Sequence, residues 1–323
     1  MRAIRVERPG GAEALVATEV DGPTPGTGEV LVAVEAAGVN FIDVYHRSGR
    51  YPLPMPTGIG VEGAGTVIGL GPDVTAPALG TRVAWLGVQG SYAERVVVPA
   101  DRAVIVPEAV TTELAAAVLL QGLTAHALTH DTRALGPGDT VLVWAAAGGA
   151  GRLVVQLASA RGARVLACVS TEAKAEEVRR LGADAVRVTG DGVDVAAWVR
   201  GETEGRGVEV VYDSVGAASI TASLDACARL GLVVSYGQSS GPVPPIDVLE
   251  LSRRGSLFLT RPTVFDHLVT PEALASRAAA VLGAVAEGTL DVRVHDRLPL
   301  DAAAAAHRAL ESRATSGKLL LLP

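Results

Sequence analysis

The first 110 residues of the chain alternate short runs of β-branched residues with glycine and proline. Runs of this kind, bounded by turn-forming residues, are typical of β-strands. They predict strands at residues 29–35, 65–69, 82–85 and 92–98. The pattern therefore predicts a small, irregular β domain at the start of the chain.

The pattern changes at residue 111, where an alanine-rich stretch through about residue 133 favours a helix. After a turn at residues 136–139, strands and helices alternate. Strands are expected at 140–144, 164–168, 185–188, 208–212, 232–236 and 257–260, and helices at 152–160, 172–181, 195–200 and 220–230. Repeated strand–helix units need crossover connections, which are right-handed and build a parallel sheet covered on both faces. We therefore predict a doubly wound domain here.

The tail of the chain has a long predicted helix at 271–287, a strand around Val292 and a helix at 300–312. We expect this tail to return to the first domain. A chain of 323 residues also exceeds what one hydrophobic core usually organises, at roughly 150 residues per domain. The prediction is one domain of residues 1–124 and 262–323 and a second of residues 125–261.

Composition and charge exclude several classes of protein. Apolar residues make up 49% and charged residues 20%, which excludes a mainly disordered chain. The net charge of −7 argues against nucleic acid as the main partner. The longest apolar region, 114–128, is interrupted by polar residues and falls short of the ~18 apolar residues of a membrane span. The first residues lack the apolar stretch of a secretory signal, so we expect a cytoplasmic protein.

The two cysteines are consistent with a reducing compartment. Cys168 and Cys227 are far apart, in what we predict to be a buried strand and a helix, with neither a C-x-x-C motif nor a metal-ligand spacing. Both are expected to be plain core residues.

The sharpest local motif is Ala145-Ala-Ala-Gly-Gly-Ala-Gly151, which lies between a predicted strand and a predicted helix. Glycines at 148 and 149 allow the backbone to approach a pyrophosphate, and Gly151 allows the helix to pack closely on the strand. In this context the motif favours a dinucleotide-binding turn over a bare structural turn. The expected cofactor contacts are Ala147, Gly148, Gly149, Ala150 and Gly151.

The end of the second strand indicates which dinucleotide is bound. An NAD site places an acidic residue there, about 20 positions after the glycines, whereas residues 168–171 contain no acid. Ser170 and Lys174 are suited to a 2′-phosphate, and one charge-assisted hydrogen bond contributes about 1.5–3 kcal/mol. We therefore expect NADPH. The alternative is that Lys174 is a solvated helix residue paired with Glu172 or Glu177.

Seven motifs spread over the whole chain resemble the NADPH:quinone oxidoreductase (zeta-crystallin) branch of the medium-chain dehydrogenases/reductases. They lie at residues 38–52, 60–65, 121–124, 145–151, 213–216, 235–241 and 311–315. The resemblance implies an α/β fold with two parts. A GroES-like irregular β-barrel would be the catalytic domain, and a Rossmann doubly wound parallel sheet would bind the cofactor.

The zinc alcohol dehydrogenases, which that family resembles in fold, place a Cys where Asn40 stands, a His where Val61 stands and a Cys where Gln121 stands. The resemblance thus implies a metal-free protein, although His126 and His130 are spaced as two ligands on one helix face. Without a Lewis acid, alcohol oxidation is an improbable reaction. A quinone mainly has to be stacked against the nicotinamide, so positioning becomes the main catalytic contribution.

The same resemblance implies roles for individual residues. Asn40, Tyr45, Tyr51, Gln121 and Thr124 would line the place where nicotinamide meets substrate; Asn40 and Thr124 would orient the cofactor and the two tyrosines would form an aromatic surface, unless these tyrosines simply pack. Further cofactor contacts are expected from Ser214, Val215, Tyr236, Gly237 and Gln238 at strand ends and from Arg261 and Arg313. Asp43 and Glu62 are interpreted as structural acceptors for backbone or Arg donors, with an acid/base pair as the alternative. The chain departs from the family at Thr189, where a Tyr is common, and at Gln121, where many members have Lys.

Three functions stay open at this point. The first is NADPH-dependent reduction of quinones, and the second is reduction of an activated C=C bond in an enone, alkenal or enoyl thioester, with Tyr51 as proton donor. The third is an NADPH-binding protein with a structural, redox-sensing or RNA-binding role. The apolar strand at 255–260 is expected at a sheet edge that needs covering, which predicts a homodimer through the cofactor domain.

Overall fold

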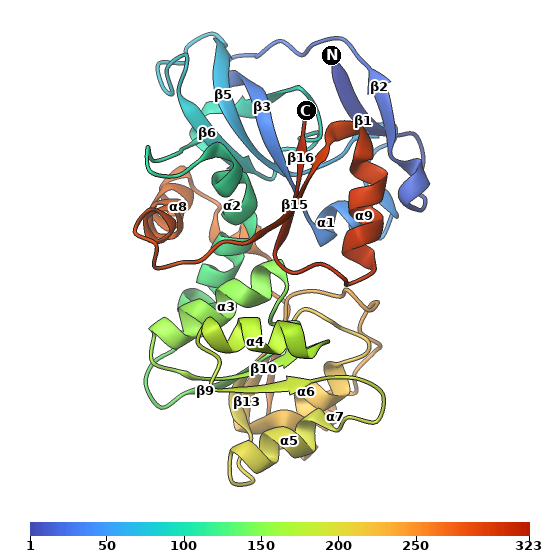
Figure 1. Ribbon diagram of the computed structural model, residues 1–323, viewed down its shortest axis with the longest axis vertical. Coiled ribbons are helices and arrows are strands. Elements are labelled where there is room, and N and C mark those ends of the chain that lie inside the picture. The colour runs from blue at the N-terminus through green and yellow to red at the C-terminus, as the bar shows by residue number, and fades with distance from the viewer. The chain divides into compact units, whose positions relative to one another are not determined.

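The computed structural model describes all 323 residues and divides into two compact units. Unit 1 contains Met1–Leu123 and His267–Pro323, and unit 2 contains Thr124–Asp266. The tail of the chain from His267 onwards therefore belongs to the same unit as the β-rich first residues. Figure 1 shows the elements of each unit along the chain.

Unit 1 is built on two sheets. A seven-stranded sheet has the order β15-β16-β3-β5-β6-β8, with β7 also paired to β3, and a three-stranded sheet has the order β2-β1-β4. The strands are β1 (Arg2–Val6), β2 (Val16–Glu19), β3 (Glu29–Val39), β4 (Thr57–Gly58), β5 (Glu62–Leu70), β6 (Arg82–Leu86), β7 (Arg95–Pro99), β8 (Val104–Ile105), β15 (Val294–Pro299) and β16 (Lys318–Leu322). The helices are α1 (Phe41–Arg47), α2 (Thr112–His126), α8 (Pro271–Ala286) and α9 (Ala303–Glu311), and the last residues of α2 belong to unit 2.

The core of unit 1 follows from alternation along its long strands. In β3, Val30, Val32 and Val34 are buried while the residues between them are half-buried. A period of two places such residues on one face of a sheet. They pack in one cluster with Trp85 and Tyr92, both of which are fully buried.

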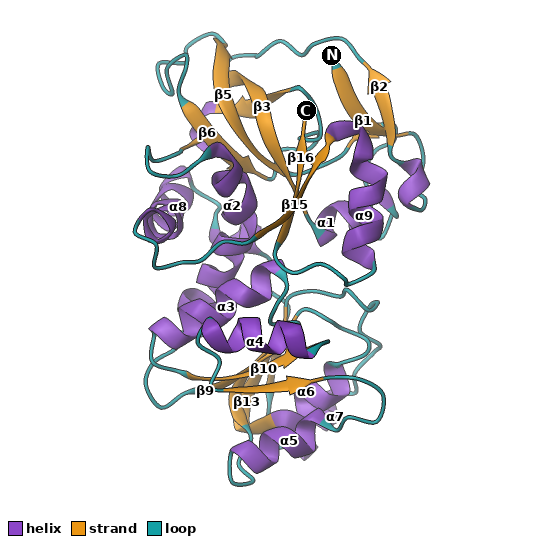
Figure 2. Ribbon diagram, viewed as in Figure 1, coloured by secondary structure: helices purple, strands orange, loops and turns teal.

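Unit 2 is a six-stranded sheet whose paired strands are all parallel, in the order β11-β10-β9-β12-β13-β14. Figure 2 shows α3 and α4 on one side of this sheet and α5 and α6 on the other. The strands are β9 (Thr140–Val143), β10 (Arg164–Val169), β11 (Ala185–Val188), β12 (Val208–Asp213), β13 (Cys227–Ser235) and β14 (Phe258–Thr260). The helices are α3 (Gly149–Ala160), α4 (Glu172–Arg180), α5 (Val195–Glu202), α6 (Ile220–Ala226) and α7 (Val248–Arg253). This strand order, 3-2-1-4-5-6 in chain order, is that of dinucleotide-binding domains, and the predicted doubly wound α/β class is confirmed.

The structure corrects the prediction of a helix through residue 230. Helix α6 ends at Ala226, and Cys227 opens strand β13, where it pairs with Val208. Local sequence there is compatible with a helix, but parallel pairing with β12 outweighs that preference. Cys227 is nevertheless fully buried, like Cys168, and burial raises the pKa of both thiols above its ordinary value.

The apolar region at 114–128 forms most of α2, and a π-helical turn follows it at Ala127–Thr132. Among all helices of the chain, none combines the length and the apolar character that crossing a bilayer requires.

Candidate functional site

The glycine-rich turn of unit 2 connects β9 to α3. Ala145 adopts a φ of +49°, an uncommon conformation for a residue other than glycine, and Gly148 N donates to its carbonyl at 2.8 Å. A Cβ on Gly151 would lie 2.4 Å from that same oxygen. The first helical turn of α3 therefore packs directly on the glycine-rich turn, and its N-terminal amides lie at the carboxyl end of β9. Unpaired amides at a helix N-terminus can bind phosphates.

The loop after β12 lies at the same end of the sheet, because β9 and β12 are parallel neighbours. Between them the strand order reverses, and open α/β sheets bind ligands at such a point. The fully buried Asp213 organises this loop by accepting hydrogen bonds from Val215 N (2.8 Å) and Gly216 N (3.0 Å). Its carboxylate also accepts from the hydroxyls of Ser219 and Ser223 at 2.6–2.7 Å. The predicted cofactor residues Ser214 and Val215 are positioned by this carboxylate. Asp213 is part of the family motif at residues 213–216, but the sequence alone predicted no role for it.

The loop after β13 packs on the loop after β12. Tyr236 N donates to Asp213 O at 2.8 Å, and a Cβ on Gly237 would lie 2.6 Å from Ser214 O. Tyr236, Gly237 and Gln238 are half-buried there. The structure thus brings the two predicted groups of cofactor residues together at the carboxyl ends of neighbouring strands.

The end of β10 has the polar pair expected for a 2′-phosphate. Lys174 Nζ donates to the hydroxyl of the exposed Ser170 at 3.4 Å. The neighbouring Glu177 accepts from Arg152 at 2.9 Å. Partial burial lowers the pKa of Lys174. The structure therefore combines Ser170 and Lys174 on one surface after the second strand.

The structure also shows where three other residues from the sequence analysis lie: Thr189, Arg261 and Arg313. Thr189 donates its hydroxyl to Val169 O at 3.0 Å and so supports the end of β10. Arg261 and Arg313 are exposed side chains of unit 2 and unit 1, respectively. Their contact with cofactor phosphates stays a prediction.

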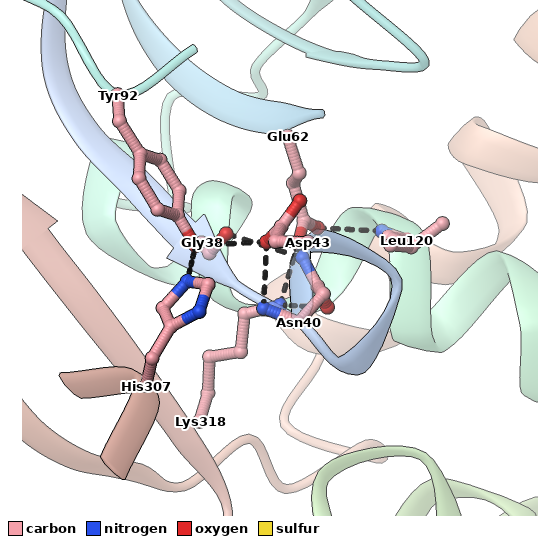
Figure 3. A network of polar contacts seen from close by, with 8 residues as sticks. All are labelled: Gly38, Asn40, Asp43, Glu62, Tyr92, Leu120, His307 and Lys318. Carbon is pink, nitrogen blue, oxygen red and sulfur yellow. Dashed lines mark hydrogen bonds and ion pairs between the residues drawn. The ribbon is translucent and has the colours of Figure 1, made fainter. Parts of the chain in front are cut away.

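Unit 1 contains a buried polar network around Glu62 and Lys318, which Figure 3 shows. The side chains of Lys318 and Glu62 are 1% and 0% exposed, and Lys318 Nζ lies 2.5 Å from Glu62 Oε2. Lys318 also donates to Asn40 Oδ1 at 2.7 Å. The sequence predicted Glu62 as an acceptor for backbone or Arg donors; the backbone donor is present, since Leu120 N donates at 2.6 Å, but the cation is a lysine.

Asn40 uses its side-chain amide within this network. Its Nδ2 donates to Glu62 Oε2 at 2.8 Å and to Gly38 O at 3.1 Å. Asn40 also caps α1 in a reciprocal capping box with Asp43. The amide therefore stabilises the N-terminus of α1, and its predicted contact with nicotinamide stays a prediction.

Asp43 continues the network towards α9. Its Oδ2 accepts from Asn40 N (2.9 Å) and from the Tyr92 hydroxyl (2.8 Å), which lies 3.2 Å from His307 Nε2. Arg47 Nη1 lies 3.3 Å from His307 Nδ1 and pairs with Glu311, so His307 accepts at Nδ1 and donates from Nε2. Burial, and then Arg47, lower the pKa of His307 to about 3, which keeps the ring neutral. The chain of contacts attaches α1 to α9.

Asp43→Asn is expected to change how stability depends on pH. Burial raises the pKa of Asp43 to about 7, so between about pH 4 and 7 the folded protein keeps a proton that the unfolded chain releases. The Asp43 contribution to stability therefore falls as pH rises through this window, by up to ~1.4 kcal/mol per pH unit. The unfolding free energy of Asp43→Asn, minus that of the wild type, should rise from pH 4.5 to pH 7.5 in urea denaturation. The contribution of His307 is present in both proteins and cancels in this difference. A difference in unfolding free energy that stays constant with pH contradicts the prediction.

The predicted aromatic residues meet at the end of α1. The rings of Tyr45 and Tyr51 lie edge to face with centroids 5.1 Å apart, and Tyr51 N donates to Tyr45 O at 3.0 Å. Tyr45 is buried at 6% exposure, whereas Tyr51 is half-buried. The Arg50 guanidinium lies 5.1 Å from the Tyr45 ring centroid. Tyr51 is thus the phenol of this pair that offers more surface to a ligand.

The remaining predicted residues lie on α2. Gln121 and Thr124 are half-buried and three positions apart, a spacing that places two side chains on neighbouring parts of a helix surface. His126 and His130 stack with ring centroids 3.9 Å apart. No group of three or more His, Cys, Asp or Glu side chains in the chain is arranged to bind a metal ion.

Comparison with known proteins gives consistent matches over both units. The family described as "Alcohol dehydrogenase GroES-like domain" matches residues 26–108, and that described as "Zinc-binding dehydrogenase" matches residues 149–282. A quinone oxidoreductase of Pseudomonas aeruginosa is 41% identical over 97% of each chain, and a 2-haloacrylate reductase of a Burkholderia species is 39% identical over 98% of each.

Among solved structures, the Escherichia coli quinone oxidoreductase complexed with NADPH superposes with a TM-score of 0.97, 38% identity and full coverage of both chains. The fold, the motifs and the full-length similarity agree with one another. The chain therefore belongs to the quinone oxidoreductase family of medium-chain dehydrogenases/reductases and is an oxidoreductase.

Proposed function

We propose that the chain is a cytoplasmic NADPH-dependent quinone reductase that transfers hydride without a catalytic metal. The observation that carries the proposal is the site in unit 2, where a glycine-rich turn at the reversal of strand order is combined with Ser170 and Lys174 after the second strand. The similarity to quinone oxidoreductases over the whole chain supports the same activity.

The residues of unit 2 fit NADPH, which supplies a hydride from its nicotinamide ring when bound. Glycines at 148, 149 and 151 leave the α3 N-terminus with no side chain larger than the methyl group of Ala150, so a pyrophosphate can approach its amides. Lys174 supplies a positive charge and Ser170 a hydroxyl donor for the 2′-phosphate. Asp213 keeps the loop of Ser214 and Val215 in one conformation for the cofactor.

The residues proposed to face the acceptor act by positioning. Tyr45 and Tyr51 form an aromatic pair against which a planar quinone can pack, and the Tyr51 phenol can donate a hydrogen bond to a quinone oxygen. Gln121 and Thr124 present polar groups from α2. Reduced quinone oxygens can take their protons from water, so no protein acid is required for this acceptor.

The direct test is steady-state oxidation of NADPH and, separately, of NADH in the presence of a chelator. The acceptors are 1,4-benzoquinone, 9,10-phenanthrenequinone and a simple enone. Quinone-dependent NADPH oxidation that the chelator leaves unchanged is the expected result. Tight NADPH binding without turnover of any acceptor would overturn the proposal and favour a binding or regulatory role.

Lys174→Ala is expected to raise KM for NADPH by about 10- to 100-fold, since one charge-assisted hydrogen bond contributes about 1.5–3 kcal/mol. KM for NADH should stay unchanged, because NADH lacks the 2′-phosphate. Initial rates over a range of each cofactor measure both values. Arg179→Ala, at the other end of the same helix, is the matched control and should leave both KM values unchanged. An equal loss for both cofactors would contradict the assignment.

A second candidate function is reduction of an activated C=C bond. The similarity to a 2-haloacrylate reductase favours it, and the half-buried Tyr51 phenol is a candidate proton donor to carbon. Tyr51→Phe should then lower enone reduction by about 100-fold or more while quinone reduction survives. Tyr45→Phe is the control for packing. Equal activity of Tyr51→Phe and wild type on an enone would exclude Tyr51 as the acid.

We also propose a homodimer through the free edge of the unit 2 sheet. Edge strand β14 exposes Phe258 at 60% and Leu259 at 37%, and the nearby helix α7 exposes Val248 at 76%. An apolar edge strand left uncovered is prone to pair with another chain, and a two-fold partner covers both edges at once. Sedimentation at micromolar concentration should give the mass of two chains, and a strictly monomeric profile would contradict the proposal.

A further inference from the structure

Lys318 is one of only two lysines in the chain, and its ammonium group is buried against Glu62. Burial of an ion pair carries a large desolvation cost, so well-packed apolar residues often stabilise a protein as well or better. Stability alone is therefore a weak explanation for this pair. What the pair contacts points to a more specific role.

The Glu62 carboxylate joins four chain segments. One oxygen accepts from Lys318 on β16 and from Asn40 before α1, at 2.5 and 2.8 Å, and the other accepts from Leu120 N on α2, at 2.6 Å. Glu62 itself begins β5. Packing leaves no spare room, because a Cβ on Gly38 would lie 2.5 Å from Glu62 Oε2 and 2.7 Å from Lys318 Cε.

The segments that meet at Glu62 are those with the proposed acceptor-facing residues. Asn40 caps α1, which carries Tyr45 and leads to Tyr51, and Leu120 directly precedes Gln121. Figure 3 shows Lys318 and Leu120 approaching Glu62 from different elements. A shift of this carboxylate would therefore move both groups of residues at once.

We propose that Lys318 and Glu62 are positioning residues of the reductase, which fix Asn40 with α1 and the backbone beside Gln121 in the geometry that hydride transfer needs. This inference rests on the proposed function. Rates of such reactions fall by about 100-fold when reacting groups are misplaced by about 1 Å. Loss of the pair should thus lower kcat. Affinity for NADPH should change little, because its proposed contacts at the glycine-rich turn and at Ser170 and Lys174 lie in unit 2.

The test compares Lys318→Met, Glu62→Gln and the double variant with wild type, at a temperature where circular dichroism shows each to be folded. In both single variants kcat should fall by about 100-fold, with KM for NADPH within about twofold and a larger isotope effect from NADPH deuterated at the transferred position. The double variant removes both charges, so its melting temperature should recover while kcat stays low. If kcat of the double variant recovers together with its melting temperature, the proposal is wrong.

Arg82→Met is the matched control. Arg82 donates to the carbonyls of Val110, Pro107 and Glu108 in unit 1, and none of these acceptors is a proposed site residue. It should lower the melting temperature without lowering kcat. An equal loss of kcat in this control, or a kcat within about threefold of wild type in folded Lys318→Met, would show that the pair is merely structural.

Amide hydrogen exchange separates this inference from the proposed function. Lys318→Met should speed exchange at Leu120 and at residues 40–44, while the amides of unit 2 exchange as in wild type. If the wild-type protein fails to oxidise NADPH with any of the acceptors tested, the proposed function fails. Hydrogen exchange alone then decides whether the pair fixes these segments. Unchanged exchange at Leu120 and at residues 40–44 would overturn the inference in either case.

Discussion

Asp213→Ala is expected to lower the free energy of unfolding by about 4 kcal/mol, because each buried donor left without an acceptor costs about 1–3 kcal/mol. The carboxylate of Asp213 is fully buried, and it accepts hydrogen bonds from two backbone amides and from the hydroxyls of Ser219 and Ser223. Affinity for NADPH should fall as well, since the loop of Ser214 and Val215 loses the group that fixes it. Urea denaturation followed by tryptophan fluorescence, and titration with NADPH, measure the two effects.

Asp213→Asn gives a graded comparison. Its amide oxygen can still accept from Val215 N and Gly216 N, while its NH₂ group faces Ser223, so roughly half of the loss is expected. Asp225→Ala is the control in the same unit: Asp225 pairs with Arg254 and is 44% exposed, and such pairs contribute about 1 kcal/mol or less. Equal losses for Asp213→Ala and Asp225→Ala would contradict the role given to the Asp213 carboxylate.

Most of unit 2 could be predicted from the sequence because its signals are local. Each strand is a short apolar run, and each helix begins near a turn, so the alternation alone indicates the parallel sheet and the place of the glycine-rich turn. The prediction failed at Cys227, where the partner strand β12 decides between helix and strand. Pairing across a sheet is information that a short window of sequence does not contain.

The network of unit 1 could not be predicted, because its members are far apart in the chain. Lys318 is 278 positions from Asn40 and 256 from Glu62. Strand β16 is a leucine run without alternation, and it lies between β3 and β15. The available signal was that Lys318, one of two lysines in the chain, begins this leucine run. That signal indicates that the lysine is buried, but it does not indicate which residue it pairs with.

The glycine-rich turn shows why some local signals carry more weight than others. A Cβ at Gly151 would lie 2.4 Å from Ala145 O and 3.0 Å from Ala146 Cα, and both are backbone atoms that cannot rotate away. Ala145 already has a φ of +49°, which leaves the turn little freedom to adjust. Any side chain at position 151 therefore has to displace α3 from β9.

Gly151→Ala is thus expected to weaken NADPH binding by about 100-fold, equivalent to about 2.7 kcal/mol, and to lower the free energy of unfolding by about 1–3 kcal/mol through overpacking. Gly201→Ala is the matched control, since its Cβ meets nothing within 4 Å and it lies in helix α5. That control should raise stability by up to about 1 kcal/mol, because alanine favours helix, and should leave binding unchanged. Quenching of tryptophan fluorescence by NADPH and thermal denaturation measure both variants. If Gly151→Ala binds NADPH within about threefold of wild type, the close contact between α3 and the turn does not shape the cofactor site, and the first-turn amides bind phosphate from a position that tolerates displacement.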